Sequence, residues 1–283
     1  MVDVITGATG NVGSLVVERL IARGDRPRIF VRDADKARAR YGDRVYIFTG
    51  DLADAETLAP ALAGADTLFL VNSGPELEEL DGLAAKAARA AGVKHLVKLS
   101  SYDAQEQNVG TGVWHAGGEA AIRASGIPFT FVQPSGFMVN ALWWARSIKA
   151  EGVVRSATGD GKIPFIHSDD IADVAVQALV APECVGQSLP ITGPEALSYA
   201  DMAAKIGAAI GRSIRFEPIS EDEERRKMVS RDEPAEIVAA HLSIYRAIRE
   251  GRLAAVTETV ERVLGRKAIT FDQWVRENVA AFQ

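Results

Sequence analysis

The sequence has few of the residues that mark several classes of protein. Cys184 is the only cysteine among 283 residues, so no internal disulfide can form, and we expect a cytoplasmic protein in a reducing compartment. No uncharged run approaches the ~20 residues of a bilayer-spanning helix, and Gly7 and Gly10 interrupt the first apolar run, so we expect neither membrane span nor leader. The net charge of −6 argues against a broad basic face for nucleic acid. No metal site is predicted.

Short apolar runs alternate with helical patterns along the first half of the chain. The runs cover residues 28–31, 45–48, 67–71, 95–99 and 129–132, and a long amphipathic segment lies between the third and the fourth. This alternation is typical of a parallel sheet covered by helices on both faces. We therefore predict an α/β fold, a Rossmann-type doubly wound parallel sheet in residues 1–135. Residues 136–283 are expected to form a smaller mixed α/β lobe interwoven with it, and a helix at about 169–181 to pack back on the Rossmann domain.

The first strand enters a turn with glycines at three-residue spacing, and a helical pattern follows at once. In such a turn Gly7 permits the tight bend, Gly10 allows a pyrophosphate close to the backbone, and Gly13 lets the helix pack against its strand. Free N–H groups and the helix dipole then favour phosphate. The spacing alone is a weak signal, because a turn of this kind could close any strand-to-helix connection. The residues predicted to contact the cofactor here are Gly7, Thr9, Gly10, Asn11, Val12 and Gly13.

The end of the second strand indicates which dinucleotide is bound. Arg32 follows that strand directly, where an acidic residue would bond the ribose hydroxyls of NADH and an arginine would pair the 2′-phosphate of NADPH. Lys36, one helical turn later, adds positive charge on the same side. The neighbouring Asp33 complicates the choice, and Arg32 could also be a solvated turn residue. We favour NADPH over NADH.

Other strand ends add further candidates, since ligands of parallel sheets lie at the carboxyl ends of the strands. Asp51 is placed to meet the adenine ring, although a helix-capping role would look the same. The polar turn at residues 72–74 would run past the middle of the cofactor, or would be an ordinary turn. The cofactor contacts predicted from these strand ends are Asp51, Leu52, Asn72, Ser73, Gly74 and Ser100.

The reactive end needs a donor for charge that develops on a substrate atom. Ser101 follows the fifth strand, and His115 and Glu119 are four residues apart on one helix face. A histidine near neutral pKa can give a proton, and a nearby carboxylate can orient it. The alternative is a surface pair on an exposed helix. Residues 103–112 are expected to form a mobile loop beside the ligand, and the charged segment 221–227 a solvated helix face.

Taken together these motifs resemble the atypical short-chain dehydrogenase/reductases, specifically the NmrA-like group of NADPH-dependent quinone, azo-dye and triphenylmethane-dye reductases. The resemblance extends over residues 2–182 and is looser to the end. Its motifs are the glycine turn, Val31 to Ala37, Gly50 to Leu52, Leu99 to Ser101, His115-x-x-x-Glu119, Ser125 to Thr130, Gln133 to Met138 and the helix start at His167 to Ala172.

The resemblance implies that the glycine turn binds pyrophosphate, that Arg32 binds the 2′-phosphate, and that Pro134 borders the nicotinamide. Ordinary short-chain dehydrogenases carry Tyr-x-x-x-Lys where this chain has His115-x-x-x-Glu119, so the usual proton donor and the lysine that lowers its pKa are absent. The two glycines between His115 and Glu119 are unusual and would loosen that helical turn.

These observations lead to a reductase of a small conjugated or aromatic acceptor, of the quinone, dye, imine or enone type, by direct hydride transfer from NADPH. Catalysis is assigned to His115, Ser101 and Glu119. The alternative is a non-catalytic NADP(H)-sensing regulator that binds a protein partner; an epimerase or dehydratase acting on a nucleotide sugar would keep the missing tyrosine. We expect a small-molecule substrate and a monomer or homodimer. The residues predicted to contact the acceptor are Tyr102, Phe137, Met138, Trp143 and Trp144.

Overall fold

The computed structural model describes residues 1–106 and 109–283, so the centre of the predicted mobile loop, residues 107 and 108, lies outside the described residues. The chain forms two compact units that interleave along the sequence. The first unit comprises Met1–Gln105, Trp114–Gln133 and Ser168–Pro190. The second unit comprises Glu106–Val113, Pro134–His167 and Ile191–Gln283.

The first unit is built on a seven-stranded sheet in the order β3-β2-β1-β4-β5-β6-β9. The pairings from β3 to β6 are all parallel, as predicted. Each predicted strand is present, with ends that differ by at most two residues. The strands are β1 (Asp3–Thr6), β2 (Arg28–Val31), β3 (Tyr46–Thr49), β4 (Thr67–Leu70), β5 (His95–Leu99), β6 (Phe129–Pro134) and β9 (Ser188–Ile191).

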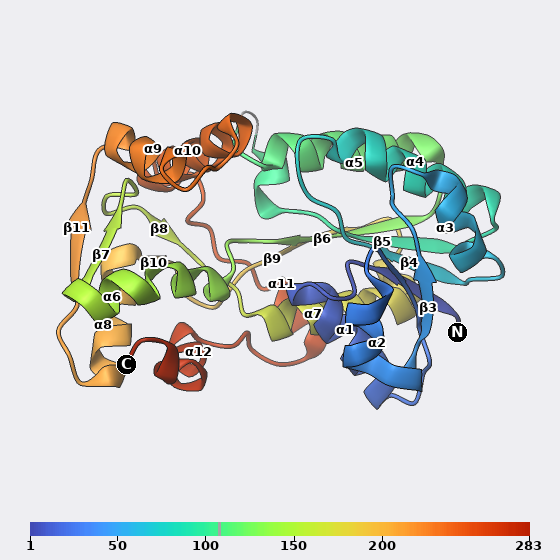
Figure 1. Ribbon diagram of the computed structural model, residues 1–283, viewed down its shortest axis with the longest axis horizontal. Helices are drawn as coiled ribbons and strands as arrows, with labels where there is room; N and C mark the ends of the chain where they lie inside the picture. Colours follow the sequence, from blue (N-terminus) through green and yellow to red (C-terminus); the bar gives the residue numbers. More distant parts are fainter. Residues whose placement is uncertain (107–108) are drawn as a thin grey trace. The chain divides into compact units, whose positions relative to one another are not determined.

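Helices cover both faces of this sheet, which confirms the doubly wound arrangement (Figure 1). One face carries α1 (Asn11–Ala22), α2 (Ala34–Tyr41) and α7 (Ser168–Val180), and α7 packs against α1 and against strands β4 and β5. The other face carries α3 (Ala55–Leu62), α4 (Leu77–Ala90) and α5 (Gly112–Ser125). Consecutive residues of the central strands, such as Leu68 and Phe69, are therefore fully buried on opposite faces.

The second unit mixes short strands and helices, as predicted. β7 (Val153–Ser156) pairs in parallel with β11 (Arg215–Pro218), and β8 (Lys162–Ile163) pairs antiparallel with β10 (Leu197–Ser198). The 3-10 segment η3 (Met138–Trp144) leads into α6 (Ala145–Glu151). The remaining helices are α8 (Tyr199–Ile210), α9 (Glu221–Val229), α10 (Ala235–Arg249), α11 (Thr259–Leu264) and α12 (Phe271–Glu277).

Helix packing holds the second unit together. α8 packs against β7, β11 and α12, and α9 packs against α10. β8 is short, because only residues 162–163 pair with β10; Ile166, three residues later, forms an isolated bridge to Phe137. Among the helices of the described residues, none has both the length and the apolar character to cross a bilayer.

Candidate functional site

The glycine turn between β1 and α1 has no room for side chains at two of its positions. Gly7 has φ of +60°, and a Cβ there would lie 2.8 Å from Cβ of Val71. A Cβ on Gly13 would lie 2.3 Å from the carbonyl oxygen of Gly7. The first turn of α1 therefore packs directly on the end of β1, which only glycine at position 13 allows.

Two hydroxyl groups fix the position of this turn. Thr6 Oγ1 accepts a hydrogen bond from the Val71 amide at 2.7 Å and joins the ends of β1 and β4. Tyr41, at the end of α2, donates its phenolic hydrogen to the carbonyl of Ala8 at 2.5 Å and is buried. The sequence alone did not point to Tyr41, because its partner lies 33 residues away. The backbone of the turn is thus held before any ligand binds.

The start of α1 is open to an anion. Gly10 precedes the helix in an extended conformation and supplies no side-chain cap, and the first turn contains no acidic residue. The first amides of a helix have no partner within it, and they carry the positive end of the helix dipole. A pyrophosphate fits this arrangement, since the missing side chains at Gly7, Gly10 and Gly13 leave the backbone accessible.

The two charged residues after β2 have different roles. Asp33 caps α2, and its Oδ1 accepts the amide of Lys36 at 2.9 Å. The exposed guanidinium of Arg32 makes no hydrogen bond or ion pair with any described residue. The carboxylate of Asp33, which could have bonded a ribose, is therefore bonded to its own helix. The exposed side chains of Arg32 and Lys36 provide positive charge for a ligand phosphate.

The next two strand ends form tight local turns. Asp51 Oδ1 accepts the amide of Ala53 at 3.0 Å, and Asp54, not Asp51, caps α3. Asn72 Oδ1 accepts the amide of Ser73 at 2.9 Å. Leu52 packs partly against the core, and Gly74 has φ of +110°. The helix-capping alternative for Asp51 is wrong, and its side chain stays exposed at the strand end.

Glu119 lies at the centre of a buried polar cluster. It is 4% exposed, and its Oε1 accepts hydrogen bonds from Ser100 at 2.5 Å and from Gln133 at 2.7 Å. Its Oε2 accepts from Arg123 at 3.2 Å. The carboxylate does not orient His115, contrary to the expectation from their spacing, because its oxygens are bonded to other strands and to its own helix. The surface-pair alternative is wrong as well, since Glu119 is buried.

A second buried pair lies beside this cluster. Lys98 on β5 and Asp81 on α4 are both fully buried, with Nζ 2.5 Å from Oδ2. Burial raises the pKa of Asp81 and lowers that of Lys98, while the ion pair opposes both shifts. A Cβ on Gly118 of α5 would lie 2.3 Å from Asp81 Oδ2, so the glycines of α5 allow a close approach to α4. A lysine within an apolar strand was the sequence signal for this pair, and it was missed.

His115 is a neutral imidazole in this environment. Its Nδ1 is buried with no hydrogen-bond partner among the described residues. Burial, together with the positive charge of Lys98, lowers the pKa of His115 to about 3. The expectation of a pKa near neutrality was therefore wrong. A neutral ring can still donate one N–H hydrogen bond.

Comparison with known proteins decides the family. A family model described as NAD(P)H-binding matches residues 7–182, which include the glycine turn, Arg32 and the buried polar cluster. The chain belongs to this NAD(P)H-binding family. An NAD(P)H azoreductase of Xenophilus azovorans is 37% identical over 281 residues, which cover 98% of each chain. A (4-alkanoyl-5-oxo-2,5-dihydrofuran-3-yl)methyl phosphate reductase of Streptomyces griseus is 37% identical over 280 residues, again 98% of each chain.

Solved structures of the family have the same fold. The NADPH complex of a quinone oxidoreductase of Escherichia coli superimposes with a TM-score of 0.88 at 26% identity, and covers 98% of this chain and 99% of that one. These relatives confirm the predicted resemblance to the NmrA-like reductases, and with it the prediction of an NAD(P)H-dependent oxidoreductase.

In this member of the NAD(P)H-binding family, Ser101 donates its hydroxyl hydrogen to Oδ1 of the buried Asp103. It therefore offers lone pairs, not a hydrogen, to other groups, which differs from the donor role expected for it. Tyr102 begins a 3-10 segment and is half-buried. Among the described residues, no group of three or more acidic, histidine or cysteine side chains could hold a metal ion.

The other predicted acceptor contacts lie in the segment Pro134–His167 of the second unit. Pro134 ends β6, and Phe137 forms a bridge to Ile166. Met138 is buried, whereas Trp143 is 60% exposed. The ring of Trp144 lies 4.8 Å from that of Tyr199, measured between centroids. Phe137, Met138, Trp143 and Trp144 thus belong to one short stretch of chain, and their contact with an acceptor stays a prediction.

Proposed function

We propose that this protein is an NADPH-dependent reductase of small conjugated or aromatic acceptors of the quinone, dye, imine or enone type. The observation that carries the choice of cofactor is at the end of β2, where Asp33 is bonded to its own helix and Arg32 has no partner among the described residues. The proposal is supported by the acceptors named for two relatives, a quinone and an azo compound.

The residues of the first unit would hold NADPH along the strand ends. The glycine turn and the start of α1 would bind the pyrophosphate, and Arg32 with Lys36 would bind the 2′-phosphate. Asp51 and Leu52 would border the adenine, and residues 72–74, Ser100 and Pro134 the rest of the cofactor. When bound, NADPH supplies the hydride.

The protein side of the chemistry rests on His115. A quinone or dye delocalises the charge that it receives, so a hydrogen bond can replace the strong acid of ordinary short-chain dehydrogenases. The neutral imidazole would donate this bond. Glu119 would act as a positioning residue, because it holds Ser100 and Gln133 at 2.5 and 2.7 Å. Ser101 would accept hydrogen bonds. Tyr102, Phe137, Met138, Trp143 and Trp144 would contact the acceptor through their apolar surfaces.

The test combines turnover with cofactor choice. Purified protein is expected to oxidise NADPH in the presence of quinone or dye acceptors, and Arg32→Gln is expected to raise the Kd for NADPH about tenfold or more while changing that for NADH little, because only NADPH has the 2′-phosphate. Fluorescence titration of the reduced cofactor measures both constants.

Arg38→Gln is the matched control, since Arg38 lies on α2 and is paired with Asp35 at 3.0 Å. It should leave both Kd values unchanged. Tight NADPH binding without any acceptor-dependent oxidation would contradict the reductase and favour the sensing regulator. Equal loss of NADPH and NADH affinity in Arg32→Gln would contradict the assigned role of Arg32.

A further inference from the structure

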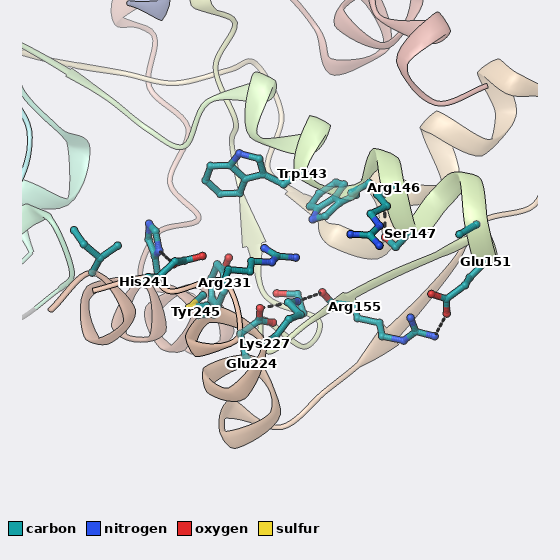
Figure 2. A pocket seen from close by; sticks show the side chains of 16 residues that line it. Trp143, Arg146, Ser147, Glu151, Arg155, Glu224, Lys227, Arg231, His241 and Tyr245 are labelled. Carbon is teal, nitrogen blue, oxygen red and sulfur yellow. Dashed lines mark hydrogen bonds and ion pairs between the residues drawn. The ribbon is translucent and has the colours of Figure 1, made fainter. Parts of the chain in front are cut away.

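The second unit contains a cavity of about 920 Å³, of which the proposed reduction uses only two tryptophans. Its wall is formed by residues of η3 and α6, of β7, and of α9 and α10 (Figure 2). All of these elements lie within the second unit. The volume is within the range of ~300–1,000 Å³ that small-molecule sites occupy.

One part of the wall is aromatic. Trp143 is 60% exposed, and its ring centroid lies 6.3 Å from that of His241 on α10, at an angle of 55°. Trp144 and the half-buried ring of Tyr245 continue this part of the wall. Flat aromatic surfaces of this kind favour a planar ligand, because stacked and edge-on ring contacts add to the burial of apolar area.

Another part carries positive charge that the protein leaves unpaired. Arg146 of α6 and Arg231, which follows α9, both line the cavity, and neither side chain makes a hydrogen bond or ion pair with any described residue. Figure 2 shows their side chains pointing toward one another in that view. The three glutamates of the wall are Glu151, Glu224 and Glu233, and none of them pairs with Arg146 or Arg231. An oxyanion between the two guanidinium groups could accept hydrogen bonds from both.

The other two basic residues of the wall are already paired. Arg155 pairs with Glu151 at 2.7 Å and with Glu217 at 2.8 Å, and Lys227 pairs with Glu224 at 2.6 Å. Among these four basic side chains of the wall, only those of Arg146 and Arg231 are left without a carboxylate partner in the described part of the chain.

Three buried polar atoms in the wall, Ser156 Oγ, Glu224 Oε2 and Glu233 Oε2, have no hydrogen-bond partner among the described residues, and Glu233 lies 3.6 Å from His241. Ser156 and Glu224 are each 2% exposed, and neither Ser156 Oγ nor Glu224 Oε2 accepts or donates a hydrogen bond within the described residues. The expectation that the charged segment 221–227 is only a solvated helix face is therefore wrong at Glu224. Unsatisfied buried acceptors are unfavourable, and a hydroxyl or amino group of a ligand would satisfy them.

We propose that this cavity binds a planar aromatic acid that carries a carboxylate, sulfonate or phosphate together with a hydroxyl or amino group. Arg146 and Arg231 bind the oxyanion, Trp143 contacts the ring, and Ser156 and Glu224 accept from the ligand's donor. The site goes beyond the proposed reduction, because its residues bind without the cofactor and belong to one unit.

Calorimetric titration of the full-length protein tests the site in the absence of NADPH. A hydroxynaphthalenesulfonate is expected to bind saturably at one site and to quench tryptophan fluorescence. In the Arg146→Met, Arg231→Met double variant its affinity should fall about tenfold or more, and in the wild type it should fall with rising ionic strength. The parent naphthol, which lacks the sulfonate, should bind at least about tenfold more weakly and should not respond to the double substitution.

Arg226→Met is the matched control, because Arg226 is an exposed arginine of α9 outside the cavity wall, and it should leave the affinity unchanged. Equal affinity of the sulfonate for wild type and double variant, or no saturable binding up to about 1 mM, would overturn the site. Equal affinity of naphthalenesulfonate with and without the hydroxyl would overturn the role of Ser156 and Glu224. None of these outcomes depends on turnover, so they are distinguishable from failure of the proposed reductase.

Discussion

At the scale of single residues, burial decides what each polar group can do. His115 and Glu119 are four residues apart, and their spacing suggested a coupled proton donor. Instead Glu119 is bonded to Ser100, Gln133 and Arg123, and His115 is left with the positive charge of Lys98 nearby. Both influences on His115 disfavour a second proton. The role proposed for His115 is therefore that of a neutral hydrogen-bond donor and not that of a charged acid.

A neutral His115 gives the reaction a particular pH dependence. Because its pKa is lowered to about 3, the imidazole does not change charge between about pH 5 and pH 8, and kcat should not follow a histidine titration in that interval. His115→Ala should lower kcat about a hundredfold through loss of the donor, and His115→Gln, which keeps an N–H group, should restore part of it. Steady-state rates with a quinone at saturating NADPH measure both effects.

The alternative, an imidazolium acid, makes the opposite prediction. A kcat that declines as the pH rises through about 6.5 would show that His115 is protonated in the working enzyme. The KM for NADPH is the internal control, since the glycine turn and Arg32 bind the cofactor through other contacts, and it should stay the same in both variants.

At the scale of elements, α5 shows how a helix can be shaped by its neighbour. The adjacent glycines 117 and 118 suggest a loosened helical turn when only α5 is considered. In the fold they face Glu78 and Asp81 of α4, and Asp81 is held by its ion pair with Lys98. The glycines thus allow α4 and α5 to approach each other around a buried charge pair. This close packing offsets the helix propensity that glycine loses at each position.

The two glycines are predicted to differ sharply when a methyl group is added. Gly118→Ala should lower the free energy of unfolding by about 1–3 kcal/mol, because its Cβ would lie 2.3 Å from Asp81 Oδ2 and 2.5 Å from Leu77 Cδ2, which cannot move freely. Urea denaturation measures this change.

Gly117→Ala is the matched control on the same helix. Its Cβ would lie 2.8 Å from Oε2 of Glu78, the end of an exposed and flexible side chain. The gain in helix propensity of up to ~1 kcal/mol should then be retained. If both variants are equally stable, the close approach of α4 and α5 is not a constraint on the sequence.

At the scale of the whole molecule, two histidines that the fold keeps neutral link stability to pH. Burial lowers the pKa of His95 and of His115, whereas in the unfolded chain both titrate near the ordinary value of 6.5. Below that value the unfolded chain takes up protons that the folded protein does not. The stabilising contribution of each group is therefore fully present above pH 6.5 and is lost as the pH falls.

The contribution of His115 is measurable as a difference. Between about pH 6.5 and pH 3 the free energy of unfolding should fall more steeply in the wild type than in His115→Gln, by up to about 1.4 kcal/mol per pH unit. His95 and the buried carboxyl groups are common to both proteins and cancel in the comparison. Urea denaturation at several pH values measures the two slopes, and parallel slopes would mean that His115 binds its proton equally in both states.

Much of the first unit was predictable because its signals are local. Four- and five-residue apolar runs that alternate with amphipathic segments leave little choice but a covered parallel sheet, and the carboxyl ends of such strands meet at one edge. The glycine turn and Arg32 follow from the same logic, since each lies directly at a strand end. Because the cofactor residues lie at strand ends, the class of cofactor could be predicted from the sequence, whereas the identity of the acceptor could not.

The rest was decided by contacts between residues far apart in the sequence. The pairing of Lys98 with Asp81, the hydrogen bonds of Glu119 with Ser100 and Gln133, and the neutral state of His115 depend on which side chains the fold buries together. The cavity of the second unit likewise needs η3, α6, β7, α9 and α10 in place. Periodicity in a sequence determines elements and strand ends, but only packing sets the burial and the charged neighbours on which proton affinity and ligand choice depend.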